Sequence, residues 1–224
     1  MHYDLVFLHT ASVHIETFSR LAEAWLPGVR IQHLVNEQLL ADAQDHDYLP
    51  AELVERIQAA VREAGKTASA VCCTCSTIGD AAEQTFSDCT GKYSIRIDRA
   101  MADQAVREAK RIKVLAALES TIGPTEQLLY SSAHRLGRRV ELDTDVVEGA
   151  WDAFQSGNLE RYHRVIAQYL AKLDGACELI VLAQASMAPA AQQQTLSCPV
   201  LSSPEIGVIA LAETLNDVTT RNRY

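Results

Sequence analysis

Residues 70–80 read AVCCTCSTIGD, and this stretch decides the fold class. Its apolar start continues a run from Ser69 to Cys73, which is typical of a strand buried on both faces of a sheet. Small polar residues follow, and a helical pattern begins at Asp80. A buried strand, a short polar turn and a helix form the repeating unit of α/β proteins, so the stretch predicts that class.

The same alternation extends over the rest of the chain. Apolar β-branched runs predict strands at residues 3–8, 29–34, 69–73, 93–97, 112–118, 139–142, 178–182 and 199–201. Three- and four-residue apolar spacing predicts helices at residues 14–26, 51–63, 101–110, 124–136, 145–154, 159–173 and 204–215, and from residue 80. The connections are short, which predicts parallel sheets with helices on both faces. The alternation begins again near residue 112, so we expect two domains, residues 1–98 with about 203–224 and residues 99–202.

Composition and charge exclude several classes of function. The chain has 224 residues and a net charge of -9, and no run of Lys or Arg stands out, which disfavours nucleic-acid binding. No stretch approaches the roughly 20 apolar residues of a membrane span, and the start lacks the pattern of a secretory signal. We therefore expect a cytoplasmic protein with a small-molecule partner, no membrane contact and cysteines that stay as thiols.

Three of the six cysteines, Cys72, Cys73 and Cys75, lie within four positions. No second close pair of Cys or His accompanies them, so no metal site is predicted, and neighbours on an extended strand make a poor disulfide. Cys72 and Cys73 point to opposite faces of the strand and are expected to pack as small hydrophobic side chains. Cys75 follows the strand where a helix begins, and there backbone N–H groups favour the thiolate. Cys75 is therefore predicted to act as a nucleophile or a base.

Small hydroxyl side chains follow most of the predicted strands. Any one of them can simply cap a helix, but together with free N–H groups they form an anion site without Lys or Arg. The candidate substrate-binding residues are Thr10, Ser12, Ser76, Thr77, Ser120, Thr121, Ala185 and Ser186. No glycine-rich nucleotide loop is present, so a small dicarboxylate or amino acid is the predicted ligand.

The order of these motifs resembles that of the aspartate/glutamate/hydantoin racemase superfamily. The resemblance rests on Cys75-Ser76-Thr77 after one buried strand, on residues 180–187, IVLAQASM, at another, and on the repeated α/β halves. It covers nearly the whole chain. It implies two pseudo-symmetric domains, flavodoxin-like or Rossmann-like, with an active-site cleft between them. It also implies no cofactor, a small carboxylate substrate and, often, a homodimer.

One position departs from the pattern of that family. Its second signature reads Val-Leu-Gly-Cys, and this chain has Gln184 where the cysteine would stand. Racemisation needs a proton donor on one face of the carbon and an acceptor on the other, and an amide serves as neither. Gln184 is expected either to orient a carboxylate or to form only a wall of the site. His9 and Glu119 are candidates for a replacement acid or base, although His9 is equally a candidate packing residue.

The sequence therefore predicts a cofactor-independent isomerase or lyase that acts at the carbon next to a carboxylate, with Cys75 as its single catalytic thiol. The resemblance also implies relatives with one reactive cysteine, which include decarboxylases of malonate-like acids and maleate isomerases. Two alternatives stay open: a true racemase with a substitute second base, and a carboxylate-binding protein without catalysis.

Overall fold

The structure, a computed structural model, describes residues 2–46, 48–86, 91–193 and 195–221, the last six of these by their backbone alone. Cys89 lies outside the described residues. The chain divides into two compact units, Met1–Ala100 with Pro204–Tyr224 and Met101–Ser203. None of the described helices is both long and apolar enough to cross a membrane.

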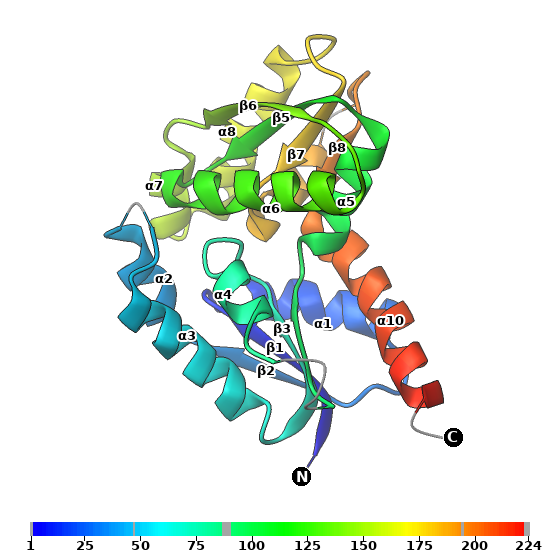
Figure 1. Ribbon diagram of the computed structural model, residues 1–224. Coiled ribbons are helices and arrows are strands. Elements are labelled where there is room, and N and C mark those ends of the chain that lie inside the picture. Colours follow the sequence, from blue (N-terminus) through cyan, green and yellow to red (C-terminus); the bar gives the residue numbers. More distant parts are fainter. Residues whose placement is uncertain (1, 47, 87–90, 194, 222–224) are drawn as a thin grey trace. The chain divides into compact units, whose positions relative to one another are not determined.

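The first unit contains one parallel sheet with the strand order β2-β1-β3-β4. Its elements are β1 (Tyr3–His9), α1 (His14–Trp25), β2 (Ile31–Val35), α2 (Gln38–Gln44), α3 (Ala51–Ala64), β3 (Ala68–Cys73), α4 (Gly79–Glu83), β4 (Tyr93–Arg96) and α10 (Ser203–Arg221). Helix α1 lies on one face of the sheet, and α2 and α3 lie on the other (Figure 1). A Cβ atom at Gly207 of α10 would lie 2.2 Å from the Ile97 carbonyl oxygen, so only glycine allows this helix to pack so closely.

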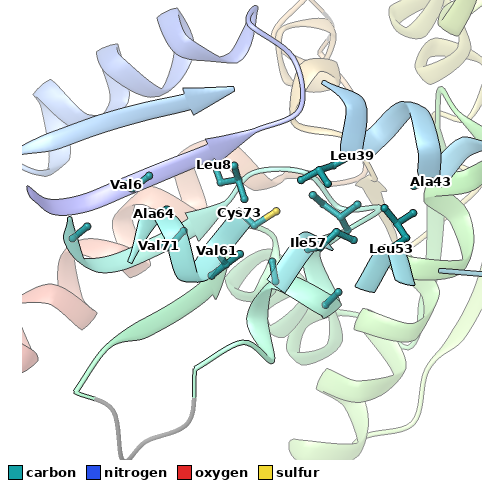
Figure 2. Close-up of a cluster of buried hydrophobic side chains, with 14 residues drawn as sticks. Val6, Leu8, Leu39, Ala43, Leu53, Ile57, Val61, Ala64, Val71 and Cys73 are labelled. Atoms are coloured by element: carbon teal, nitrogen blue, oxygen red, sulfur yellow. The ribbon is translucent and has the colours of Figure 1, made fainter. Parts of the chain in front are cut away.

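Apolar alternation along β1 and β3 builds the core of this unit. Leu8 and Cys73 pack against Ile57 of α3, and the Cys73 sulfur points into that cluster (Figure 2). Cys72, fully buried, pairs with Phe7 of β1, which faces α1. The prediction that Cys72 and Cys73 pack as core residues is confirmed.

The second unit repeats this arrangement with the strand order β6-β5-β7-β8. Its elements are β5 (Arg111–Ala116), η2 (Glu119–Thr121), α6 (Ile122–Arg135), β6 (Glu141–Val146), α7 (Ala150–Gln155), α8 (Leu159–Lys172), β7 (Leu179–Leu182), η3 (Ala185–Met187), α9 (Ala188–Ala191) and β8 (Val200–Ser202). Helix α5 (Arg99–Glu108) begins in the first unit and continues into the second. Helices α6 and α8 cover opposite faces of the second sheet (Figure 1). Two parallel sheets with helices on both faces confirm the predicted fold class.

One predicted element begins at the wrong residue, and one helix was not predicted. The helix expected at residues 145–154 includes Asp145, which lies in strand β6, and residues 38–44, for which no element was predicted, form α2. The predicted strand at residues 139–142 overlaps only the start of β6. Its polar continuation was missed because the carboxylates there form ion pairs with Lys113 of β5, at 2.8 Å from Asp143 and 2.6 Å from Asp145. This stabilisation comes from a neighbouring strand and leaves no trace in the local pattern.

The strand order locates the candidate ligand sites. In each unit the chain places its first and third strands side by side, β1 next to β3 and β5 next to β7. Such neighbours form the switch point of an open parallel sheet, and ligands bind beyond the carboxyl ends of the strands there. The relevant loops follow β1 and β3 in the first unit, and β5 and β7 in the second.

Candidate active site

Cys75 lies in the loop between β3 and α4, at the switch point of the first sheet. Its sulfur accepts hydrogen bonds from the Thr10 hydroxyl, from the Thr77 hydroxyl, and from the backbone N–H groups of Thr77 and Ile78. The bond from Thr10 joins the end of β1 to the end of β3. The structure therefore brings three predicted site residues, Cys75, Thr10 and Thr77, into one group.

The protonation state of Cys75 differs from the prediction. Burial raises the pKa of the Cys75 thiol above its ordinary value, and the four hydrogen bonds offset only part of that rise. The expected N–H donors are present, but the predicted net lowering of the pKa is wrong, because a thiolate loses more hydration on burial than these donors return. At neutral pH Cys75 carries its proton and has donors in place for the thiolate.

A buried ion pair holds the loop that carries Cys75. Arg96 donates to Asp98 through Nε at 2.7 Å and Nη2 at 3.0 Å, and both residues are almost fully buried. Arg96 Nη2 also donates to the Ser76 carbonyl at 3.3 Å, and the Ser76 hydroxyl bonds to Asp98. Burial acts to raise the pKa of Asp98, but Arg96 and Ser76 lower it by more. The Ser76 side chain thus contributes to the ion pair, and its role as a carboxylate ligand stays a prediction.

Sequence reasoning missed this ion pair. Arg96 and Asp98 flank the buried Ile97 at the end of β4, so two charged residues of opposite sign share one side of an apolar segment. That pattern is the signal that could have found them, because buried charges in proteins are normally paired.

His9 forms part of a buried chain of hydrogen bonds. Its Nδ1 lies 2.8 Å from the Thr74 hydroxyl and its Nε2 lies 2.9 Å from His33 Nδ1, while His33 Nε2 lies 3.1 Å from the Ser19 hydroxyl. The Thr74 hydroxyl donates its proton to the Leu8 carbonyl at 3.3 Å. His9 must then donate from Nδ1 and accept at Nε2, so each donor and acceptor is used once with both rings neutral.

This chain of hydrogen bonds supports a structural role for His9. Burial, with the nearby His14 and His33, lowers the pKa of His9 to about 3. Both ring nitrogens are engaged and the ring stacks on His33, with the ring centroids 5.2 Å apart. The geometry supports the packing alternative for His9 and offers no free nitrogen for a second acid or base.

Gln184 lies at the equivalent switch point of the second sheet, after β7. Its Oε1 accepts a hydrogen bond from the Ala117 N–H at 2.8 Å, which determines the orientation of the amide. The buried Nε2 of Gln184 and the buried Oγ of Ser120 have no hydrogen-bond partner among the described residues. Buried donors without a partner cost free energy, and an oxygen-rich ligand would satisfy both.

Ser186 and Ala185 follow Gln184 in the short helix η3. The Ser186 hydroxyl lies 2.8 Å from the Tyr162 hydroxyl, and the Ser186 carbonyl lies 3.0 Å from His163 Nε2. Burial raises the pKa of Tyr162. Ser186 therefore helps to attach η3 to α8, while Ala185 is buried.

The remaining predicted residues occupy varied environments. Ser12 and Glu119 are exposed. Thr121 is buried, and its carbonyl accepts a hydrogen bond from the Thr125 hydroxyl at 2.8 Å. Within the described part of the chain, no three side chains of His, Cys, Asp or Glu gather as they would around a metal ion.

Comparisons with known proteins identify structural relatives. No family model and no curated protein matches the chain. A glutamate racemase isoform from Bacillus anthracis is 17% identical, with a TM-score of 0.69 over 96% of this chain and 82% of its own. The aspartate racemase of Picrophilus torridus is 12% identical, with a TM-score of 0.70 over 95% of this chain and 94% of its own. Allantoin racemase from Klebsiella pneumoniae is 22% identical, with a TM-score of 0.55 over 96% and 89%. The chain therefore has the two-unit α/β fold of these glutamate, aspartate and allantoin racemases.

Proposed function

We propose that the chain is a cofactor-independent isomerase of the aspartate/glutamate/hydantoin racemase superfamily, acting at the carbon next to the carboxylate of a small acid. One observation carries the proposal: the Cys75 sulfur lies among four hydrogen-bond donors at the switch point of a parallel sheet. The shared fold supports the superfamily, and the relatives named for glutamate, aspartate and allantoin support a small polar substrate.

Cys75 moves the proton in this proposal. Its raised pKa makes the protonated thiol the resting form, which can deliver a proton to a carbanion next to a carboxylate. The thiolate left behind is stabilised by the donors of Thr10, Thr77 and Ile78, which are already in position. Run in reverse, the same thiolate removes a proton from that carbon.

Gln184 and Ser120 offer donors for an oxygen-rich ligand within the second unit. Gln184 Nε2 and Ser120 Oγ are buried without partners in the described structure, and both can donate to a carboxylate. The bond from the Ala117 N–H prevents the Gln184 amide from turning over. These two side chains can orient a ligand, but neither is an acid or a base at neutral pH, so neither replaces a second base.

One observation favours a second candidate function. Gln184 stands where the family has its second cysteine, and it carries no ionisable proton. A reaction with a single proton transfer suits this arrangement. Loss of CO₂ from a malonate-like acid, followed by protonation of the resulting carbanion by Cys75, is such a reaction.

Paired variants of Cys75 test the proposal. Cys75→Ala and Cys75→Ser are compared with wild type on aspartate, glutamate, hydantoins, maleate and aryl- or alkyl-malonates, by chiral chromatography and by deuterium uptake from solvent. We expect both variants to lose at least about 100-fold in kcat, the usual scale for a proton-transferring group. Cys177→Ser, which changes a partly buried thiol elsewhere, serves as the matched control. Equal turnover by wild type and Cys75→Ala would exclude Cys75 as the catalytic thiol.

Deuterium uptake separates the alternatives. Uptake from both enantiomers indicates a racemase with a second base, whereas uptake from one enantiomer indicates transfer on a single face. A ligand that shifts the melting temperature without any turnover would favour a carboxylate-binding protein.

A further inference from the structure

Cys177 and Cys198 form a close pair of thiols in the second unit. Their sulfur atoms lie 3.5 Å apart, and both are free cysteines. We propose that this pair is a reversible disulfide site, closed by small-molecule disulfides such as oxidised glutathione. A disulfide bond is about 2.05 Å long, so the two sulfurs must approach by about 1.5 Å, a shift on the scale of side-chain rotation.

The backbone segments that carry the two cysteines are already fastened together. The Asp174 carboxylate accepts hydrogen bonds from the Ser197 N–H at 2.6 Å and from the Ser197 hydroxyl at 2.5 Å. The strands that follow the two cysteines, β7 and β8, are paired in one sheet. Closing the disulfide therefore requires little movement of the main chain, and the two thiols face each other at a high effective concentration.

The two thiols differ in their access to solvent. Cys177 is partly exposed and lines a surface cavity of about 240 Å³ together with Arg111 and Lys113, whereas Cys198 is buried. Burial and the neighbouring Cys198 raise the pKa of Cys177 to about 11. Because Cys177 is the thiol that solvent reaches, we assign the first attack to it. Only the thiolate attacks, so the rate should increase about tenfold for each unit by which the pH is raised, as long as the pH stays below that pKa.

The exchange balances in two steps. The Cys177 thiolate attacks one sulfur of the oxidant, which breaks the S–S bond of the oxidant and releases one thiolate. Cys198 then loses its proton and attacks the Cys177 sulfur, which forms the protein disulfide and releases the second thiolate. Two electrons pass from the protein dithiol to the oxidant, and excess reduced thiol reverses both steps.

The position of the pair separates it from the candidate active site. Cys177 and Cys198 precede β7 and β8, so they lie at the amino ends of these strands, whereas Gln184 follows the carboxyl end of β7. The proposal therefore does not depend on the proposed function.

Tryptic mapping tests the proposal with the folded protein. No Lys or Arg lies between residues 172 and 221, so the 173–221 peptide contains Cys177 and Cys198 alone, while the 67–92 peptide contains the other four cysteines. The folded chain is equilibrated in mixtures of reduced and oxidised glutathione, its free thiols are alkylated, and it is digested with trypsin. We expect the 173–221 peptide to lack alkylation and to be 2 Da lighter than the dithiol, as one S–S bond replaces two S–H bonds. Cleavage after Glu178 should then yield two joined fragments.

Three comparisons make the result decisive. Cys75→Ser should behave like wild type, and Cys198→Ser should retain a glutathione adduct on Cys177. The equilibrium constant for disulfide formation should be at least about tenfold higher in the folded chain than in the urea-unfolded chain. In the unfolded chain the two cysteines meet only when the loop between them closes by chance. Two results would overturn the proposal. One is full alkylation of Cys177 and Cys198 in the folded chain, in a glutathione mixture that already oxidises the unfolded chain. The other is a stable glutathione adduct on Cys177 in the wild-type protein.

Discussion

At the scale of the residue, Cys75 shows two opposing effects on one thiol. Burial raises the pKa of the thiol, and the donors of Thr10, Thr77 and Ile78 lower it by less. Burial therefore determines the resting protonation state, while the donors determine how much free energy the thiolate costs when it forms. A group that must release and regain a proton needs both effects, because burial alone would make the thiolate inaccessible.

The contribution of the donors can be measured with Thr77→Val. A hydrogen bond to a charged group contributes about 1.5–3 kcal/mol, so we expect the pKa of Cys75 to rise by about 1–2 units. Alkylation of Cys75 by iodoacetamide at pH 8, followed by tandem mass spectrometry, should then be at least about tenfold slower. Thr85→Val is the matched control, because the Thr85 hydroxyl lies just after α4 and donates to the Ala81 carbonyl of that helix. An unchanged rate in Thr77→Val would show that this hydroxyl does not stabilise the thiolate.

At the scale of the element, the start of α4 is shaped by the end of β4. The Arg96–Asp98 pair bonds to Ser76 and holds the loop that carries the sulfur. Helix α4 begins at Gly79, where a Cβ atom would lie 2.9 Å from Arg96 Nε. Because Asp98 binds the buried guanidinium through two bonds, the guanidinium has no room to move away.

We therefore expect Gly79→Ala to lower the free energy of unfolding by about 1–3 kcal/mol, the usual cost of overpacking. Gly123→Ala is the matched control, since this glycine also lies in the first turn of a helix and a Cβ there meets nothing within 4 Å. That control should gain up to about 1 kcal/mol from the lower chain entropy of the unfolded state. Urea denaturation measures both values. Equal stability of the two variants would contradict the close contact between Gly79 and Arg96.

At the scale of the whole molecule, stability should depend on pH through buried histidines of the first unit. Burial lowers the pKa of His9 to about 3 and that of His14 to about 4, and it also lowers the pKa of His33. A histidine in the unfolded chain has a pKa near 6.5, so below that pH the unfolded chain binds protons at positions where the folded chain stays neutral. The stability contributed by the neutral rings is complete above about pH 6.5 and is lost as the pH falls toward 4.

His9→Gln tests this dependence. Each such histidine contributes a slope of about 1.4 kcal/mol per pH unit, so wild type should lose about 1.5 kcal/mol more than the variant between pH 6.5 and 5.0. Trp25 lies in the first unit and Trp151 in the second, so fluorescence in a Trp151→Phe background reports on the first unit. His46→Gln, at an exposed histidine, should retain the wild-type slope. If stability depended on pH in the same way in wild type and in His9→Gln, the lowered pKa of His9 would be contradicted.

The homodimer stays a prediction.

Most of the fold was predictable because its signals are local. Buried runs and helical spacing located β1, β3, β5 and β7 to within a few residues. Helix α8 begins at the predicted residue 159, and Asn158 caps it, since its side chain accepts from the Arg161 N–H at 3.0 Å. The failures lie where neighbours override the local pattern. Strand β6 can be polar because Lys113 of β5 pairs with its carboxylates. A local window of sequence around β6 does not include this lysine.

The sequence by itself determined that Cys75 follows a buried strand and that Gln184 follows the equivalent strand of the second half. Only the tertiary structure decided what surrounds them. The order of parallel strands places Thr10 beside a sulfur 65 positions away along the chain, and it turns Ser76 toward Asp98. It also shields the partly buried thiol from enough water that desolvation outweighs its donors. The physical reason is that periodicity records which face of an element is apolar, whereas hydrogen bonding and hydration depend on which elements become neighbours.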